Sequence, residues 1–449
     1  MIEVRVALGV RAGGTRRLRR FTAALLTLAG LAMGGAPALG ASGGASIPGL
    51  DRTHRSAPHT HKPKQRQSRR RGAAAPANAF ARRSVWIWEL PNSSGGDLGS
   101  IVASARQFGV GTLMIKSSDG PSFWSTQFTP QTVSTLHASG IKVCAWQYIY
   151  GNHPVTEAYM GAQAVRDGAD CLIIDAESEY EGKYVAAQTY MTRLRSLIGA
   201  SFPLALAGFP YVDFHPAFPY SVFLGPGGAQ YNLPQMYWRD IGTTTDAVFA
   251  HTYAFNEPYG RPVYPLGQLY GNPPAHQIVR FRQLSRAYGA PNLSWWDWQE
   301  TTPSEWSALS RPTGTLAGYA AQNAMVSLGR DAVGDLVVWA QEHLVAAGQP
   351  LTVDGGYGAA TQTAVQNFQT AGGLTPDGVV GPATWAALLR YTPATMIWGQ
   401  SAGRRGAIAR SALDRRRGVR VLALPRSASR AARRDEIAGA GGAGGHPGR

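Results

Sequence analysis

The chain has 449 residues, a formal net charge of +16 and two cysteines. A chain of this length has room for more than one domain. The charge does not indicate nucleic-acid binding, because the excess of Lys and Arg lies in residues 1–83 and 394–449, while the stretches between them are mildly acidic. Neither a His-x-x-x-His helix nor a pair of cysteines at zinc-ligand spacing occurs, which argues against a zinc amidase or peptidase and predicts no metal and no cofactor.

The first residues have the order of a secretory signal peptide. Arginines at 16–20 precede an apolar run at 21–31, and Ala36-Pro37-Ala38 follows as a small-residue cleavage site. The alternative is an uncleaved anchor, but the run is shorter than the roughly 20 residues of a spanning helix, and no later run is long enough. We therefore expect a signal peptide at 1–41 and no stable membrane span after its cleavage. The mature protein would be secreted, in the cell wall or extracellular.

Residues 42–83 are predicted to be a basic disordered linker, because His, Lys and Arg alternate there with Ser, Pro and Ala and few apolar residues are present. The linker is either a solvated spacer or a segment attracted to anionic wall polymers or anionic lipid. Residues 394–449, rich in Arg, Ala and Gly, are predicted to be a basic disordered tail.

Between them, residues 84–310 show apolar strands that alternate with helical patterns. We expect strands at 85–89, 111–116, 142–148, 171–175, 204–209, 234–238, 263–268 and 293–298. We expect helices at 98–108, 130–138, 155–167, 184–198, 245–255 and 274–288. This alternation predicts an α/β fold, a (β/α)8 TIM barrel. An open doubly wound sheet is the alternative, but no Gly-rich phosphate loop follows the first strand.

Active sites of such barrels lie at the carboxyl ends of the strands. The apolar strand at 171–175 ends in Asp175, and Glu177 follows two residues later, so both should lie on one face with roughly 6.6 Å between their backbones. Two carboxylates that close repel each other, which raises the pKa of one. Glycoside hydrolysis needs such a pair, so both are predicted to be catalytic. The alternative is that they cap the loop and helix that follow.

Other polar and aromatic residues fall at the predicted strand ends. The candidates for substrate binding are Trp88, Glu89, Lys116, Gln147, Gln235, Tyr237, Trp296 and Asp297. Exposed aromatic faces would stack on sugar rings, whereas a tryptophan of the core would not. Lys116 is either a counter-ion for the carboxylates or an ordinary strand-end charge.

The residues at two of these strand ends resemble those of a known enzyme family. Ile173-Ile174-Asp175-Ala176-Glu177 and Trp296-Asp297-Trp298-Gln299 resemble the barrel lysozymes of glycoside hydrolase family twenty-five. The resemblance implies that Glu177 is the proton donor and Asp175 its partner. The first strand offers Trp88-Glu89 where the family has an Asp, which favours a distant relative that acts on another glycan.

Cys144 and Cys171 lie on neighbouring predicted strands. A disulfide between adjacent parallel strands inside a barrel is geometrically awkward, so two buried thiols are favoured over a disulfide.

A short pattern occurs twice near the end of the chain. Asp354-Gly355 is followed by Gly358 and Thr361, and Asp377-Gly378 by Gly381 and Thr384. Each copy predicts a tight turn and a helix whose threonine satisfies backbone groups of the first turn. Three short amphipathic helices can then share one core, with Leu336, Val337, Ala340, Leu344, Ala364, Val365, Phe368, Trp385, Leu388 and Leu389. Residues 325–393 thereby resemble the peptidoglycan-binding module of bacterial cell-wall enzymes; the alternative is a generic three-helix bundle.

Together these features predict an exported, cell-wall-associated glycoside hydrolase that acts on peptidoglycan or another wall glycan and is anchored by its module. The alternative is a catalytically silent barrel that serves as a cell-wall-binding structural protein. No nucleic-acid partner is expected.

Overall fold

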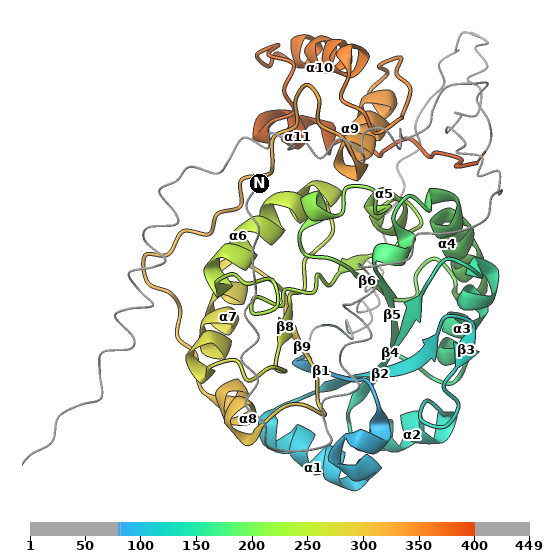
Figure 1. The fold of residues 1–449 in the computed structure, drawn as a ribbon, viewed down its shortest axis with the longest axis vertical. Coiled ribbons are helices and arrows are strands. Elements are labelled where there is room, and N and C mark those ends of the chain that lie inside the picture. Colours follow the sequence, from blue (N-terminus) through green and yellow to red (C-terminus); the bar gives the residue numbers. More distant parts are fainter. Residues whose placement is uncertain (1–79, 81, 400–449) are drawn as a thin grey trace, which may run out of the picture. The chain divides into compact units, whose positions relative to one another are not determined.

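The computed structural model describes residue 80 and residues 82–399. Within them, a ring of parallel strands is surrounded by helices (Figure 1). The sheet order is β7-β6-β5-β4-β2-β1-β9-β8, and the short β3 pairs antiparallel with β2. The strands are β1 (Ser84–Ile87), β2 (Thr112–Asp119), β3 (Ser122–Phe123), β4 (Lys142–Ile149), β5 (Cys171–Ala176), β6 (Leu204–Ala207), β7 (Tyr231–Asn232), β8 (Leu266–Gln268) and β9 (Ser294–Trp296).

The ring is closed by two isolated parallel bridges. Asn232 pairs with Val263, and Gln235 pairs with Leu266, so the ends of the sheet meet between β7 and β8. A closed ring of parallel strands with helical crossovers is a (β/α)8 barrel. The predicted TIM-barrel fold class is therefore confirmed, and the open doubly wound alternative is not what forms.

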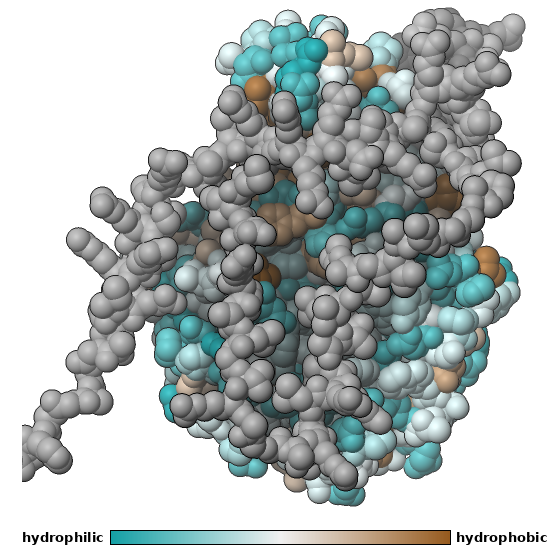
Figure 2. All heavy atoms as spheres, viewed as in Figure 1, coloured by the Kyte–Doolittle hydropathy of each residue, from teal (hydrophilic) through white to brown (hydrophobic). Residues whose placement is uncertain are grey.

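The helices follow the expected pattern closely. The barrel helices are α1 (Leu98–Phe108), α2 (Pro130–Ala138), α3 (Pro154–Arg166), α4 (Tyr184–Ile198), α5 (Tyr220–Leu224), α6 (Thr245–Asn256), α7 (Ala275–Ala287) and α8 (Pro303–Ser310). Side chains of Asp97, Thr129, Thr244 and Thr302 accept hydrogen bonds at the amino ends of α1, α2, α6 and α8. Such caps fix where a helix begins. On the face drawn in Figure 2, the outer surfaces of these helices are mostly hydrophilic.

The sixth barrel strand differs from the prediction. A strand was expected at 234–238, but the regular pairing is at Tyr231–Asn232, and only Gln235 adds a bridge beyond it. Pro234 lacks a backbone N–H and interrupts the ladder. After it the chain bends, because the backbone N–H of Tyr237 donates to the carbonyl of Gln235.

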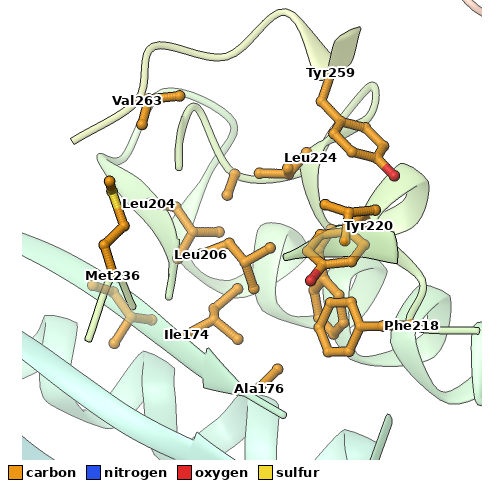
Figure 3. Close-up of a cluster of buried hydrophobic side chains, with 14 of the residues drawn as sticks. Ile174, Ala176, Leu204, Leu206, Phe218, Tyr220, Leu224, Met236, Tyr259 and Val263 are labelled. Carbon is orange, nitrogen blue, oxygen red and sulfur yellow. The ribbon is translucent and has the colours of Figure 1, made fainter. Parts of the chain in front are cut away.

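Alternate residues along the strands fill two different spaces. Trp86, Met114, Cys144, Ile173 and Ala205 belong to one buried cluster, which occupies the interior of the barrel. The residues between them face the helices: Figure 3 shows Ile174, Ala176, Leu204 and Leu206 packed with Phe218 and Tyr220. This two-residue period decides which side chains can reach the lumen.

Cys144 and Cys171 form a disulfide, so the expectation of two buried thiols is wrong. Both residues face the lumen and lie directly opposite each other in the register of β4 and β5. Their Cα atoms are 4.6 Å apart, which is within the range of disulfides. Adjacent parallel strands can therefore be bridged where the two cysteines are exactly in register.

The carboxyl-side helices are α9 (Asp335–Ala346), α10 (Ala359–Ala371) and α11 (Pro382–Leu388). The expected apolar residues form their core, with Val337, Leu344, Val365, Trp385 and Leu388 all buried. A glutamine stands over each Asp-Gly turn. Gln341 accepts from the backbone N–H groups of Asp354 and Gly355, and Gln369 accepts from that of Gly378.

The threonines of the repeated pattern have a different role from the predicted one. The hydroxyl of Thr361 donates to the carbonyl of Gly356 and accepts from the amide of Gln341, and Thr384 makes the same pair of contacts with Val379 and Gln369. Neither threonine caps its helix, because each stands inside the first turn rather than at its start. In each copy, hydrogen bonds from a glutamine and a threonine side chain thus stabilise the turn.

The predicted signal peptide at 1–41, nearly all of the linker at 42–83 and residues 400–449 of the tail lie outside the described residues. The first residues of the predicted tail are ordered: Gln188 of α4 donates to the carbonyl of Met396 and accepts from the backbone N–H of Trp398. Among the residues described, no helix is both long and apolar enough to cross a membrane.

Candidate active site

Two carboxylates lie at the carboxyl end of β5, where the sequence placed them. Asp175 follows the lumen-facing Ile173, whereas Ile174 between them packs toward the helices. Asp175 is 6% exposed, and Glu177, just beyond the strand, is partly buried. We call Asp175 and Glu177 the carboxylate pair.

Gln235 joins the two acids. Its side-chain nitrogen Nε2 donates to Oδ1 of Asp175 and to Oε1 of Glu177, each at 3.0 Å. The bridge between Gln235 and Leu266 fixes the backbone from which this side chain extends. Two oxygens that accept from one nitrogen must lie close together, so the structure brings both predicted catalytic residues and one predicted binding residue into one group.

Burial raises the pKa of both members of the pair. For Asp175 the pKa lies well above its ordinary value, because burial and then the charge of Glu177 disfavour ionisation, and Lys116 opposes them only in part. For Glu177 burial is again the largest cause, and the hydrogen bond from Gln235 opposes it. A pair of this kind retains a proton at a higher pH than an isolated carboxyl group.

Tyr148 of β4 belongs to this group, although the sequence did not suggest it. It is directly opposite Asp175 in the register of β4 and β5, and its hydroxyl donates to Glu179 at 2.9 Å. Glu179, in the turn that follows β5, thus helps to hold the tyrosine. The hydroxyl of Tyr148 also lowers the pKa of Glu177.

Lys116 of β2 is surrounded by aromatic rings. Its Nζ forms an ion pair of 2.5 Å with Asp119 and lies 4.4 Å from the ring centre of Trp124 and 4.9 Å from that of Trp146. Trp88, at the end of β1, is farther away at 6.0 Å. Lys116 is only 5% exposed, so these contacts replace most of its hydration.

The remaining aromatic candidates line the same part of the lumen. Trp296 of β9 packs against Trp146 with ring centres 5.3 Å apart and against Trp88 at 6.4 Å. Tyr237 packs edge-on against Tyr270 at 5.5 Å. Trp88, Trp124 and Trp296 keep part of their surface exposed, which leaves ring area for contact with a ligand.

Asp297 is fully buried at the turn after β9. Its Oδ1 accepts from the backbone N–H of Glu300 at 3.3 Å, and its Oδ2 has no hydrogen-bond partner among the described residues. Burial, followed by the charge of Glu300, raises the pKa of Asp297 to about 8. An uncharged carboxyl group is therefore the stable form at neutral pH.

Two predicted residues lie apart from the carboxylate pair. Gln147 faces the helices: its amide donates to the carbonyl of Glu157 and its oxygen accepts from the hydroxyl of Tyr190. Glu89 accepts from the side chain of Asn92, within the turn that follows β1. In these contacts, the side chains of Gln147 and Glu89 do not point toward the carboxylate pair.

Among the described residues, no group of three or more His, Cys, Asp or Glu side chains is arranged to hold a metal ion. What the arrangement offers chemically is proton transfer by paired acids next to partly exposed indole rings.

The fold and the site define a (β/α)8-barrel protein with a carboxylate pair in the barrel and a helical module on its carboxyl side. Residues 333–388 match the family model described as "Putative peptidoglycan binding domain". The peptidoglycan-binding resemblance of the module is thereby confirmed, and a domain of this kind associates the chain with cell-wall peptidoglycan.

Two relatives match about a fifth of the chain. An "Uncharacterized protein in bpoA1 3'region" of Kitasatospora aureofaciens is 43% identical over 90 residues, which are 20% of this chain and 75% of that protein. The chain belongs to the same family as this protein. A zinc D-Ala-D-Ala carboxypeptidase of Streptomyces albus G is 37% identical over 91 residues, which are 18% of this chain and 35% of that enzyme.

Solved structures are each similar to a part of the chain. A peptidoglycan-binding protein from Clostridioides difficile is 37% identical and matches 14% of this chain and 39% of its own, with a TM-score of 0.14. A chitinase from Chromobacterium violaceum is 11% identical over 51% of this chain and 98% of its own, with a TM-score of 0.38. A class V chitinase from Pseudomonas fluorescens is 10% identical over the same shares, with a TM-score of 0.41.

Proposed function

We propose that the protein is an exported, cell-wall-associated glycoside hydrolase, in which a barrel at residues 84–310 cleaves peptidoglycan or another wall glycan and a module at 325–393 binds the wall. The observation that carries the proposal is the shared hydrogen bond from Gln235 to Asp175 and Glu177. It couples two carboxyl groups with raised pKa values at the carboxyl end of a barrel, where the active sites of such folds lie.

In the proposed reaction the carboxylate pair supplies one proton. Glu177, the more accessible member, donates it to the glycosidic oxygen as the bond between that oxygen and the anomeric carbon breaks. Asp175 stabilises the positive charge that develops on the sugar. Water then adds its hydroxyl group to the anomeric carbon, and its remaining proton returns to the pair.

Sugar binding is assigned to the indole rings around the pair. Trp88 and Trp296 offer partly exposed faces on which sugar rings stack, and Trp124 adds a third beside Lys116. Lys116 lowers the pKa of Asp175 and so offsets part of the rise that burial and Glu177 cause. Tyr148 and Gln235 hold the carboxylates from two sides.

The module keeps the barrel near its substrate. Because binding of one part raises the effective concentration of the other, even weak affinity for peptidoglycan would increase cleavage of an insoluble wall. Export through the signal peptide proposed at 1–41 would deliver the protein to that polymer.

The test uses the mature full-length chain and its Glu177→Gln variant, each incubated with purified bacterial cell walls, with bound protein and released reducing sugar measured together. Glu257→Gln, which changes a partly buried carboxyl group outside the pair, is the matched control. We expect the Glu177 variant to bind equally and to release no sugar, while the control releases as much as the unchanged chain. Equal binding without release by any of the three would instead identify a catalytically silent, wall-binding barrel.

A further inference from the structure

A polar hollow lies at the opposite end of the barrel from the carboxylate pair. It has a volume of about 150 Å³ and is bordered by Arg83, just before β1, by the last turns of α7 and by the loop that leads into β9. Since all barrel strands are parallel, residues that precede β1 and β9 lie at the end away from residues that follow β5. We call this space the arginine hollow.

Three arginines meet there without an acidic partner. Arg282 and Arg286 come from α7, four residues apart and so on one face of the helix, and Arg83 joins them. Across residues 82–399, none of the three forms an ion pair with an Asp or Glu. Arg282 is only 7% exposed, so its charge is largely removed from water.

In its hydrogen bonds to other residues that the structure describes, each arginine uses one nitrogen, Nη1. Nη1 of Arg282 donates to the carbonyls of Ala308 and Arg311 at 2.9 and 2.7 Å. Nη1 of Arg83 donates to the carbonyl of Phe108, and Nη1 of Arg286 to that of Thr313. A guanidinium group has five N–H donors, so further donors remain on all three.

The charges act on one another. The pKa of Arg282 is lowered to about 10, first by burial and then by Arg83 and Arg286. Burial and the charge of Arg286 also lower the pKa of Arg83. An anion among the three groups would relieve both effects, because it would compensate the buried charge and the repulsion.

An independent feature of the same hollow is an unused donor. Trp295 is fully buried and borders the hollow, and its Nε1–H has no hydrogen-bond partner among the described residues. An indole N–H can only donate, and leaving it buried without an acceptor costs roughly 1–3 kcal/mol. The residues that border the hollow thus include three guanidinium groups and an indole whose N–H has no partner among the described residues.

Basic residues at the carboxyl end of a helix are common, because they complement its dipole and bond its last carbonyls. That explanation covers the presence of Arg282 and Arg286 on α7. It does not account for Arg83, which comes from outside the helix, or for the unused N–H of Trp295.

We propose that the arginine hollow binds a phosphate-type oxyanion, either as free phosphate or as a phosphodiester group of an anionic polymer. Arginine forms charge-assisted, two-pronged hydrogen bonds with phosphate oxygens, and three guanidinium groups plus an indole suit an anion with several oxygens. The small volume accommodates the anionic group rather than a whole nucleotide. The site lies apart from the proposed catalytic residues and does not depend on their activity.

Binding is tested by calorimetric titration of the full chain with inorganic phosphate and, separately, with glycerophosphoglycerol, which contains one phosphodiester. Thermal unfolding is followed with each compound against sodium chloride of equal ionic strength, because a ligand of the folded state raises the unfolding temperature. Arg286→Gln removes an exposed member of the set and Arg83→Gln a partly buried one. Arg106→Gln, an exposed arginine of α1, is the matched control.

We expect saturable binding that weakens about tenfold or more in both hollow variants, the effect of losing one charge-assisted hydrogen bond, and is unchanged in the control. If both compounds bind, the site accepts free phosphate and the phosphodiester group of a polymer. If inorganic phosphate alone binds, the site is specific for the free ion. Absence of saturable binding of either, or equal weakening by Arg106→Gln, would overturn the proposal. The ligand-induced shift is compared within each variant, so a change in its basal stability does not affect the result.

Discussion

Gln235 donates a hydrogen bond of 3.0 Å to Asp175, and Glu177 accepts from the same nitrogen at the same distance. The amide therefore fixes the separation of two acids that would otherwise repel each other. It brings no positive charge, so it leaves the pair able to keep a proton. A lysine or arginine in its place would have lowered both pKa values and removed that ability.

Replacing Gln235 tests this relationship. Its hydrogen bond lowers the pKa of Glu177, so Gln235→Met should raise that pKa further. The pair would then stay protonated to a higher pH, and the alkaline limb of the pH–activity profile should move upward while the rate at its maximum falls. The measurement is reducing sugar released from cell walls across a pH series. An alkaline limb that does not move would contradict the role given to Gln235.

Gln147 provides the contrasting substitution. Because its amide bonds Glu157 and Tyr190 between strand and helices, Gln147→Met should lower the free energy of unfolding by about 1–3 kcal/mol, the cost of buried groups left without partners. The pH profile and KM should be unchanged in the folded fraction. Denaturant unfolding and steady-state kinetics measure the two effects separately. A raised KM with unaltered stability would restore Gln147 as a substrate-binding residue.

The choice between Gln147 and Tyr148 shows where sequence reasoning ends. The sequence predicts the strand correctly and favours Gln147 as its site residue, whereas the structure places Tyr148 in the lumen and Gln147 against the helices. The alternation of side chains admits only one of two neighbours to the lumen, and which one depends on the register with the next strand. That register sets Tyr148 opposite Asp175 and could not be read from one strand alone.

Structural features that depend on neighbouring residues in the sequence were predicted more completely than contacts between distant segments. Helix limits at α1, α2 and α4 follow from local patterning, and in α1 and α2 also from a capping side chain, so they match the expected ranges. The pair at β5 follows from an apolar strand that ends in two alternating acids. The disulfide and the contacts of Met396 and Trp398 join segments far apart along the chain, and composition gives no signal for them.

The disulfide should contribute measurably to stability. It closes a loop with a sequence separation of 27, for which the loss of chain entropy in the unfolded state is worth about 3.5 kcal/mol. Replacing both Cys144 and Cys171 by Ala should lower the unfolding temperature, and a reducing agent should lower that of the unchanged chain but not of the double variant. Mass spectrometry after thiol alkylation gives the covalent state directly. Alkylation of both cysteines in the unfolded, unreduced protein would contradict the pairing.

The glutamines of the module should be essential to its fold. Gln341 bonds two backbone N–H groups, and its own amide donates to Asp354, Gly356 and Thr361. Gln341→Leu leaves those groups buried without partners, which should cost roughly 2–4 kcal/mol and reduce wall binding. Gln369→Leu should act in the same direction through its own turn.

Asn367→Leu, at an exposed position of α10, is the control for both and should leave stability and binding nearly unchanged. Chemical denaturation and co-sedimentation with cell walls make the comparison. Full wall binding by a stable Gln341 variant would show that the hydrogen bonds of Gln341 to this turn are dispensable.

Asp297 should make stability depend on pH in a defined direction. Its pKa of about 8 in the folded protein is above the roughly 4 of an unfolded chain, so the folded state holds a proton that the unfolded state has released. The contribution of this group is therefore most favourable below pH 4 and is lost as the pH rises toward 8. Asp297→Asn removes the ionisation, and its unfolding temperature relative to the unchanged chain should be higher at pH 9 than at pH 5.

The difference in unfolding temperature between the variant and the unchanged chain is taken at each pH. This difference cancels the contributions of the other titrating groups. Asp331→Asn, which alters a carboxylate with 91% of its side chain exposed, serves as the control and should show the same difference at both pH values. If the difference for Asp297→Asn does not grow between pH 5 and pH 9, Asp297 is ionised in the folded protein at neutral pH. Its Oδ2 would then need a partner that compensates a buried charge.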